Sequence, residues 1–126
     1  AFGHGLSYVD FEYSDLQANK KKYRANDVIK LTFNLKYTGE MEADEVTQVY
    51  VKRLDAQVEW PVKELKAFQR VSVGAGQTQQ VSVEIPVESL RYWDVDADTW
   101  MLENGNIEIM VGGSSDDLRL TTQVAI

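Results

Sequence analysis

The stretch VIKLTFNLKY, residues 28–37, decides the fold class of this chain. Apolar and polar residues alternate along it, and the apolar members are Ile29, Leu31, Phe33, Leu35 and Tyr37. Successive side chains of a β-strand point to opposite faces, so an alternation with period two places one kind of residue on each face. The stretch therefore predicts a strand with one buried side and one solvent-facing side.

The same alternation recurs along the rest of the chain. It appears in VDFEY (9–13), VSVEI (81–85), IEIMV (107–111) and LRLTTQVAI (118–126). The stretch EVTQVYVKRL (45–54) is apolar on both phases, which is typical of a central strand. A less regular strand is expected within VKELKAFQRVSV (62–73).

Turn residues separate these stretches. They are Thr38-Gly39, Gly74-Ala75-Gly76, Asn104-Gly105-Asn106 and Gly112-Gly113-Ser114-Ser115. Glycine and asparagine supply the positive φ that tight turns require. At most one short helical turn fits, within PVESLRYWD (86–94). About seven strands between turn signals predict an all-β fold, a seven-stranded antiparallel β-sandwich.

The composition limits the classes of function. The 126 residues suit one domain, and 44% hydrophobic residues are enough for one core. No apolar run reaches the ~20 residues of a membrane-spanning helix, so no membrane partner is expected. Without cysteine, disulfides and thiolate sites are excluded. The net charge of −7 argues against nucleic acid, and the basic cluster Lys20, Lys21, Lys22 and Arg24 is interpreted as a solvated turn.

His4 is the only histidine, and it lies between Gly3 and Gly5. A serine triad would need it as the base, but GHGLS (3–7) is not the Gly-x-Ser-x-Gly nucleophile elbow. A histidine metal site usually needs more than one such ligand. We therefore expect a connector in which His4 makes a surface or interdomain contact, with no catalytic residue and no cofactor.

Asp94, Asp96 and Asp98 have the Asp-x-Asp-x-Asp spacing of a calcium loop. An EF-hand would then need glycine and glutamate where Thr99 and Gly105 stand. The flanking helices are also missing from the pattern. An acidic hairpin turn is the preferred interpretation, and a weak calcium site of another type is the alternative.

Trp60, Tyr92, Trp93 and Trp100 are candidate sugar-binding residues. Flat aromatic surfaces stack on pyranose rings, whereas most aromatic residues of a small sandwich pack in a core or an interface. Trp93 and Trp100 flank the acidic turn, which favours pairing across a hairpin. Two interpretations therefore remain: a sugar platform formed by Trp60, Trp93 and Trp100, and simple packing of these rings. The 20 acidic residues single out no glycosidase pair of carboxylates.

Four stretches follow one another in an order that matches a known domain. They are FGHGLSYVDFEYSDL (2–16), ADEVTQVYVKR (43–53), PVKELKAFQRVSV (61–73) and ESLRYWDVDADTWMLENGNIEIMVGGSSDDLRL (88–120). Each resembles a segment of the C-terminal fibronectin type III-like domain of glycoside hydrolase family 3, and four matches in register are specific. Tyr37, Ala67 and Gly74-Ala75-Gly76 depart from the usual asparagine, glycine and Pro-Gly turn, and Ala1 from proline. These departures affect turns and packing.

The resemblance implies a domain organisation. Residues 1–8 would form the junction from a preceding catalytic region, and residues 9–126 a fibronectin type III-like or immunoglobulin-like sandwich. The interdomain contacts implied in this way are Phe2, Gly3, His4, Gly5, Leu6, Tyr8, Trp60 and Phe68. Family members hydrolyse β-linked glucosides and xylosides with retention. Their catalytic carboxylates lie in the preceding domains, so no catalytic residue is carried over.

Two functions follow as hypotheses. The first is a non-catalytic accessory domain that packs on the catalytic domains of its own parent chain, a β-glycosidase, and stabilises them. The alternative is a carbohydrate-binding module that tethers the enzyme to an oligo- or polysaccharide. An adhesion module has no motif in its favour, and a free-standing enzyme is the last choice. A periplasmic or secreted location follows from family habit alone.

Overall fold

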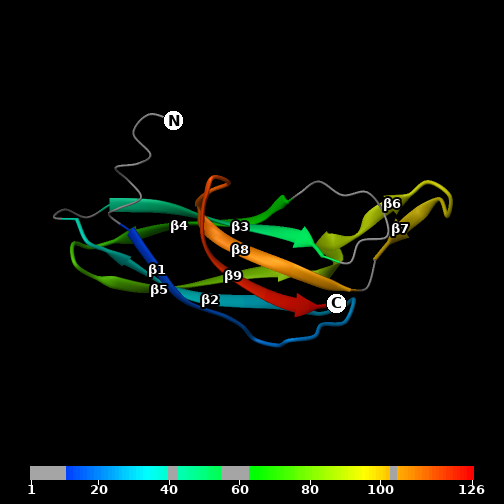
Figure 1. Ribbon diagram of the computed structural model, residues 1–126, viewed down its shortest axis with the longest axis horizontal. Helices are drawn as coiled ribbons and strands as arrows, with labels where there is room; N and C mark the ends of the chain where they lie inside the picture. Colours follow the sequence, from blue (N-terminus) through cyan, green and yellow to red (C-terminus); the bar gives the residue numbers. More distant parts are fainter. Residues whose placement is uncertain (1–10, 40–42, 55–62, 103–104) are drawn as a thin grey trace.

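The computed structural model describes residues 11–39, 43–54, 63–102 and 105–126 (Figure 1). The elements are β1 (Phe11–Ala18), β2 (Val28–Tyr37), β3 (Ala43–Arg53), β4 (Glu64–Val73), β5 (Thr78–Pro86), the 3₁₀ helix η1 (Val87–Leu90), β6 (Tyr92–Asp94), β7 (Thr99–Met101), β8 (Asn106–Ser114) and β9 (Asp117–Ala125). The helical turn expected within residues 86–94 is η1. Within these ranges, no helix has the length and apolar character needed to cross a bilayer.

Two antiparallel sheets pack face to face as a β-sandwich (Figure 1). One has the strand order β1-β2-β5 and the other β4-β3-β8-β9, while β6 and β7 form a separate hairpin. The antiparallel sandwich is confirmed, but the described residues hold nine strands and not seven. The three-stranded and four-stranded sheets account for the expected seven. The two additional strands have three residues each, too few to show an alternation in the sequence.

The core lies between the sheets and uses the predicted apolar faces. On β2, Ile29 and Leu35 are fully buried and Phe33 is 1% exposed. The buried residues of β5 and β8 are Val81, Val83, Ile85, Ile107, Ile109 and Val111. Near the C-terminus the buried residues are Val124 and Ile126, and the half-buried ones are Leu118, Leu120 and Thr122.

The strands β3 and β4 follow the predicted pattern as well. β3 pairs with β4 on one side and with β8 on the other, so it is a central strand. β4 is an edge strand, and its register with β3 shifts between Val49 and Tyr50. This bulge explains why the alternation along residues 62–73 is irregular, because an extra residue changes which side chains face the core.

Gly112 and Gly113 mark a second correction. The sequence predicted a turn over residues 112–115, but β8 runs through both glycines to Ser114, and the turn lies at residues 115–116. A Cβ on Gly112 would lie 1.8 Å from the carbonyl oxygen of Asp117 on β9. The β8–β9 register shifts at this point. Glycine therefore serves the close approach of two backbones at a bulge, and not a turn.

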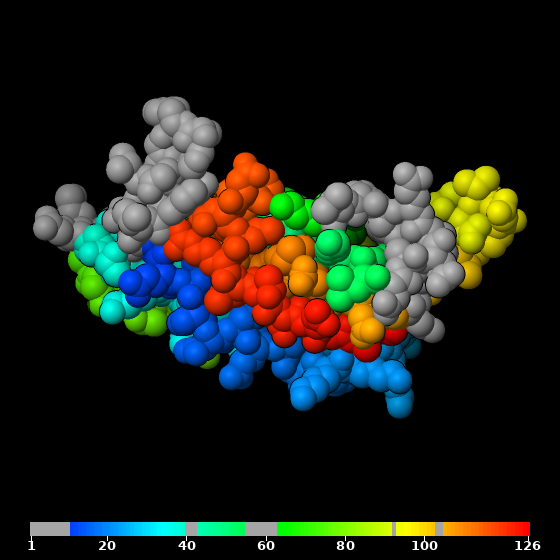
Figure 2. Space-filling view, viewed as in Figure 1, coloured from blue at the N-terminus to red at the C-terminus, as the bar shows by residue number. Residues whose placement is uncertain are grey.

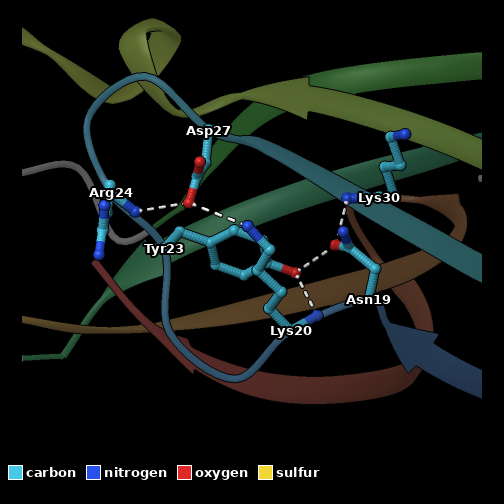
Figure 3. A network of polar contacts seen from close by, with 6 residues as sticks. All are labelled: Asn19, Lys20, Tyr23, Arg24, Asp27 and Lys30. Atoms are coloured by element: carbon cyan, nitrogen blue, oxygen red, sulfur yellow. Dashed lines mark hydrogen bonds and ion pairs between the residues drawn. The ribbon is translucent and has the colours of Figure 1, made fainter.

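The β1–β2 connection, residues 19–27, is tied to its flanking strands by a polar network (Figure 3). The Tyr23 side chain is 2% exposed, and its hydroxyl accepts a hydrogen bond from the Lys20 amide and donates one to Oδ1 of Asn19. Oδ1 of Asn19 also accepts from the amide of Lys30, at 3.0 Å. The amide of Tyr23 donates to the carbonyl of Ala125, so the connection also holds the end of β9.

The basic cluster lies in this connection. Lys20, Lys21, Lys22 and Arg24 are all exposed, as expected for a solvated turn. The Asp27 carboxylate accepts hydrogen bonds from the Arg24 amide at 2.9 Å and from Nζ of Lys20 at 3.3 Å. The first of these bonds is the main reason that the pKa of Asp27 is lowered. Within the cluster, the Lys20 side chain and the Arg24 amide therefore help to fix the loop through Asp27.

Candidate functional site

An arginine from β9 holds the start of β1. Nη1 of Arg119 donates a hydrogen bond to the carbonyl oxygen of Phe11, the first residue of β1. Nε of Arg119 pairs with Oδ1 of Asp117 at 2.9 Å, and the guanidinium lies 5.6 Å from the centre of the Tyr13 ring. These contacts fix the guanidinium, which in turn fixes the backbone at the beginning of the sandwich.

Glu45 of β3 joins this group, which we call the entry cluster: Tyr13, Glu45, Asp117 and Arg119. The Tyr13 hydroxyl donates to Oε2 of Glu45 at 2.9 Å. A Cβ on Gly113 would lie 3.0 Å from Oε2 of Glu45 and 3.5 Å from Oδ2 of Asp117, so two carboxylates flank one glycine. Oδ2 of Asp117 is buried and has no hydrogen-bond partner in the described part of the chain. Burial raises the pKa of Glu45, although its Tyr13 bond and Arg119 oppose the shift.

We expect Glu45→Gln to raise the melting temperature at neutral pH and to lose this advantage on acidification. Because the pKa of Glu45 is raised by folding, the folded chain binds a proton there more tightly than the unfolded chain does. Stability therefore falls as the pH rises through the folded-state pKa, and glutamine removes the charge responsible. Glutamine also keeps an oxygen that accepts from Tyr13.

Thermal unfolding between about pH 4 and pH 8 measures the difference in melting temperature between Glu45→Gln and the unaltered chain. Glu12→Gln, which removes an exposed carboxylate on β1, is the control for the net charge of −7. A melting-temperature difference that is the same at every pH would contradict the prediction.

An apolar patch lies on the outer face of β3 and β4, and we call it the outer patch. It consists of Val46, Leu65 and Phe68, whose exposed fractions are 42%, 48% and 69%. Phe68 lies opposite Gln48, the neighbour of the core residue Val49, so it points away from the core. Beside it, an open groove of about 550 Å³ runs between the edge strands β4 and β5.

The hairpin β6–β7 presents the predicted tryptophan pair. Trp93 and Trp100 are direct cross-strand partners with ring centroids 5.6 Å apart and an interplanar angle of 81°. The predicted pairing is confirmed. The rings are 48% and 60% exposed, as a sugar platform requires. However, they stand edge to face, so together they do not form one flat surface.

The residues between the two tryptophans form the predicted acidic turn. Oδ1 of Asp94 accepts hydrogen bonds from the amides of Asp96 and Ala97, at 2.9 and 3.1 Å. Asp98 has a φ of 54°, a left-handed conformation that aspartate tolerates. Turn geometry thus accounts for the aspartate spacing. Among the described residues, neither these three nor any other set of three acidic or histidine side chains is placed to hold a metal ion.

A pocket of about 420 Å³ opens between the hairpin and η1. Its lining residues are Pro86, Glu88, Ser89, Arg91 and Trp100. The polar lining residues belong to no sequence motif, so the sequence did not indicate them. They lie near Trp100 only because η1 folds beside β7. Two basic side chains hold η1 in place. The Arg53 guanidinium donates a hydrogen bond to the carbonyl of Leu90, and Nζ of Lys66 donates one to the carbonyl of Ser89 at 3.0 Å.

Most of the predicted interdomain contacts lie outside the described residues. These are Phe2, Gly3, His4, Gly5, Leu6, Tyr8 and Trp60. The side chain of Tyr92 is likewise outside the description. Phe68 is described and exposed, which leaves it available for a contact.

A sandwich of three and four antiparallel strands with this strand order has the fibronectin type III architecture. The sequence profile of the family described as "Fibronectin type III-like domain" matches residues 45–115. The chain belongs to this family.

Known relatives show where such a domain occurs. The chain is 36% identical to thermostable β-glucosidase B of Acetivibrio thermocellus over 99% of its own length and 17% of that protein. The crystal structure of the Bifidobacterium adolescentis GH3 β-glucosidase matches with a TM-score of 0.83 and 28% identity, over 92% of this chain and 17% of that one. β-Glucosidase 3B of Thermotoga neapolitana, solved in complex with α-D-glucose, matches with a TM-score of 0.80 and 31% identity, over 91% of this chain and 15% of that one.

The chain thus spans about a sixth of the length of these relatives (17% of the first). It is homologous to their fibronectin type III-like domain, a non-catalytic accessory part of glycoside hydrolase family 3 enzymes. The resemblance seen in the four sequence stretches is confirmed.

Proposed function

We propose that this chain is the accessory domain of a β-glycosidase and that it packs on, and stabilises, the catalytic domains of its own parent chain. One observation carries the proposal: 99% of the chain matches a β-glucosidase, yet only 17% of that enzyme is covered. A domain that is a minor part of a larger chain contacts its neighbours through an interface, which needs surface to bury.

The outer patch is the surface that we assign to this contact. Phe68 belongs to it and also to the predicted contact segment Trp60–Phe68. Burying a phenylalanine side chain that is otherwise exposed stabilises a contact by about 1.5–3 kcal/mol. Lys63 holds the chain just before β4, because its Nζ donates to the carbonyl of Ser115 at 2.7 Å and lies 5.8 Å from the Tyr50 ring. The patch is therefore presented by a restrained strand.

The entry cluster supports the same function at the start of β1. In the proposed organisation, residues 1–8 are the junction from the catalytic region, and β1 is the first described strand after them. Arg119 and Asp117 hold Phe11 at the beginning of that strand. A junction that runs into a fixed strand has fewer orientations available, which lowers the entropy lost when the two parts dock.

The test compares the full-length parent with a version lacking residues 9–126 and with the parent carrying Phe68→Ala. Removal of the domain is expected to lower the melting temperature of the catalytic part and its activity, because a bound partner stabilises the folded state. Phe68→Ala is expected to lower the melting temperature of the parent but not that of the isolated chain, where the ring is 69% exposed.

Val95→Ala is the matched control, because Val95 is 81% exposed but lies on the hairpin and not in the outer patch. Unchanged activity and melting temperature after removal of the domain would overturn the proposed function. Equal effects of Phe68→Ala and Val95→Ala in the parent would overturn the assignment of the outer patch.

A further inference from the structure

The pocket beside Trp100 combines an exposed indole with polar groups that the fold does not use. Its volume of about 420 Å³ falls within the usual range for small-molecule sites, about 300–1,000 Å³. Within the described part of the chain, the side chains of Glu88 and Arg91 form no hydrogen bond or ion pair. The Ser89 hydroxyl donates to the carbonyl of Pro86 at 2.7 Å, which leaves its oxygen free to accept. Donors and acceptors thus face one open space.

The indole of Trp100 is restrained before any ligand arrives. Trp93 packs against it edge to face, with centroids 5.6 Å apart. Trp100 is nevertheless 60% exposed and lines the pocket. A ring that is already oriented loses little conformational entropy on binding, so less of the interaction free energy is spent on ordering it.

This combination matches the chemistry of a pyranose. A β-glucosyl ring has apolar C–H faces, which stack on an indole, and a rim of hydroxyl groups, which both donate and accept hydrogen bonds. Glu88 accepts, Arg91 donates and Ser89 accepts, so neighbouring hydroxyls of one ring find partners of both kinds. One stacking ring is enough for one sugar unit, so the edge-to-face arrangement of the tryptophan pair is no obstacle.

We propose that this pocket binds a glucosyl unit of a β-linked gluco-oligosaccharide, with Trp100 as the stacking ring and Glu88, Ser89 and Arg91 as its hydrogen-bonding partners. The choice of β-linked glucose rests on the proposed function, since it takes the sugar class from the β-glucosidase relatives. The site would hold the chain of a longer glucan close to the enzyme.

The hairpin that carries Trp100 projects from the sandwich (Figure 1). In Figure 1, β6 and β7 project at one end of the long axis, whereas β1 begins near the opposite end. Figure 2 shows the hairpin extending beyond the body of the molecule. The hairpin is therefore remote from the start of β1 (Figure 1).

The experiment titrates the chain with cellohexaose and follows both the heat released and the indole N–H resonances in nitrogen–proton NMR spectra. We expect saturable binding and a shift of the Trp100 indole signal. Maltohexaose, the α-linked oligosaccharide of the same length, should bind at least about tenfold more weakly, because its curved chain does not lie along the same surface. Absence of saturable heat and of indole shifts with cellohexaose would overturn the proposal.

Variants locate the site. Trp100→Ala and Arg91→Ala are each expected to weaken binding about tenfold or more, since they remove the stacking ring and a charged hydrogen-bond donor. Phe68→Ala, on the outer patch, should bind like the unaltered chain. Trp100 and Arg91 are exposed, so both variants are expected to fold, and their amide spectra test this. Unchanged affinity in Trp100→Ala would overturn the assignment.

The outcome is separable from that of the proposed function. Sugar binding is measured on the isolated chain, whereas docking is measured by the melting temperature of the parent. If the chain fails to bind cellohexaose while Trp100→Ala destabilises the parent, the pocket is a docking contact and the sugar site is refuted. If the chain binds the sugar and the parent tolerates loss of the domain, only the stabilising role fails.

Discussion

Replacing Phe33 by alanine is expected to lower the free energy of unfolding of the chain by about 3–5 kcal/mol. Phe33 is 1% exposed and lies on β2, the middle strand of the three-stranded sheet. Its ring stacks on that of Tyr13, with centroids 5.8 Å apart. Alanine loses the transfer free energy of the ring and leaves a cavity, which a core held between two sheets fills only in part.

Urea unfolding of the isolated chain measures this loss, and Phe68→Ala is the matched control. The same substitution at Phe68 removes a ring that is 69% exposed, so the expected change is within about 0.5 kcal/mol. Similar losses for the two variants would mean that Phe33 does not lie in the core. A large loss for Phe68→Ala alone would mean that the outer patch is already covered in the isolated chain.

The contrast between these two phenylalanines shows how far the sequence predicts the fold. Phe33 lies in a strict alternation, and because the two-residue period follows from strand geometry, its burial could be predicted from the pattern alone. Phe68 lies in an irregular stretch, where a bulge opposite Tyr50 changes which side chains face inward. The hairpin strands β6 and β7 gave no periodic signal because each has only three residues.

The candidate site was predictable only in part. Trp93 and Trp100 are separated by a short acidic turn, so their cross-strand pairing follows from local spacing. Glu88 lies in η1 and Arg91 directly follows it, and their place beside Trp100 depends on how this segment and the hairpin pack. The entry cluster is even less local: Tyr13 meets Glu45, which is 32 positions away, through the packing of two different sheets.

Gly112→Ala is the other substitution for which we expect a large effect, a loss of at least about 3 kcal/mol, the upper end of the usual cost of overpacking. A Cβ at this position would lie 1.8 Å from the carbonyl oxygen of Asp117 and 2.8 Å from Cα of Leu118. Both atoms belong to the backbone of β9, so no side-chain rotation relieves the clash. The strands must separate at the bulge, where Gly112 pairs with Leu118.

The consequences should reach the start of β1. Asp117 holds the guanidinium that fixes the carbonyl of Phe11, so a displaced β9 weakens the entry cluster as well as the β8–β9 pairing. Urea unfolding gives the total loss, and faster hydrogen exchange in β1 would report the loss of that anchor. Gly76→Ala is the matched control: Gly76 has a φ of 69° but no atom within 4 Å of an added Cβ, so only backbone strain of about 1–2 kcal/mol is expected. If Gly112→Ala lowered the free energy of unfolding no more than Gly76→Ala does, the close approach of β8 and β9 would not exist in solution. Residues 112–115 would then form the glycine turn that the sequence predicts, and not a bulge.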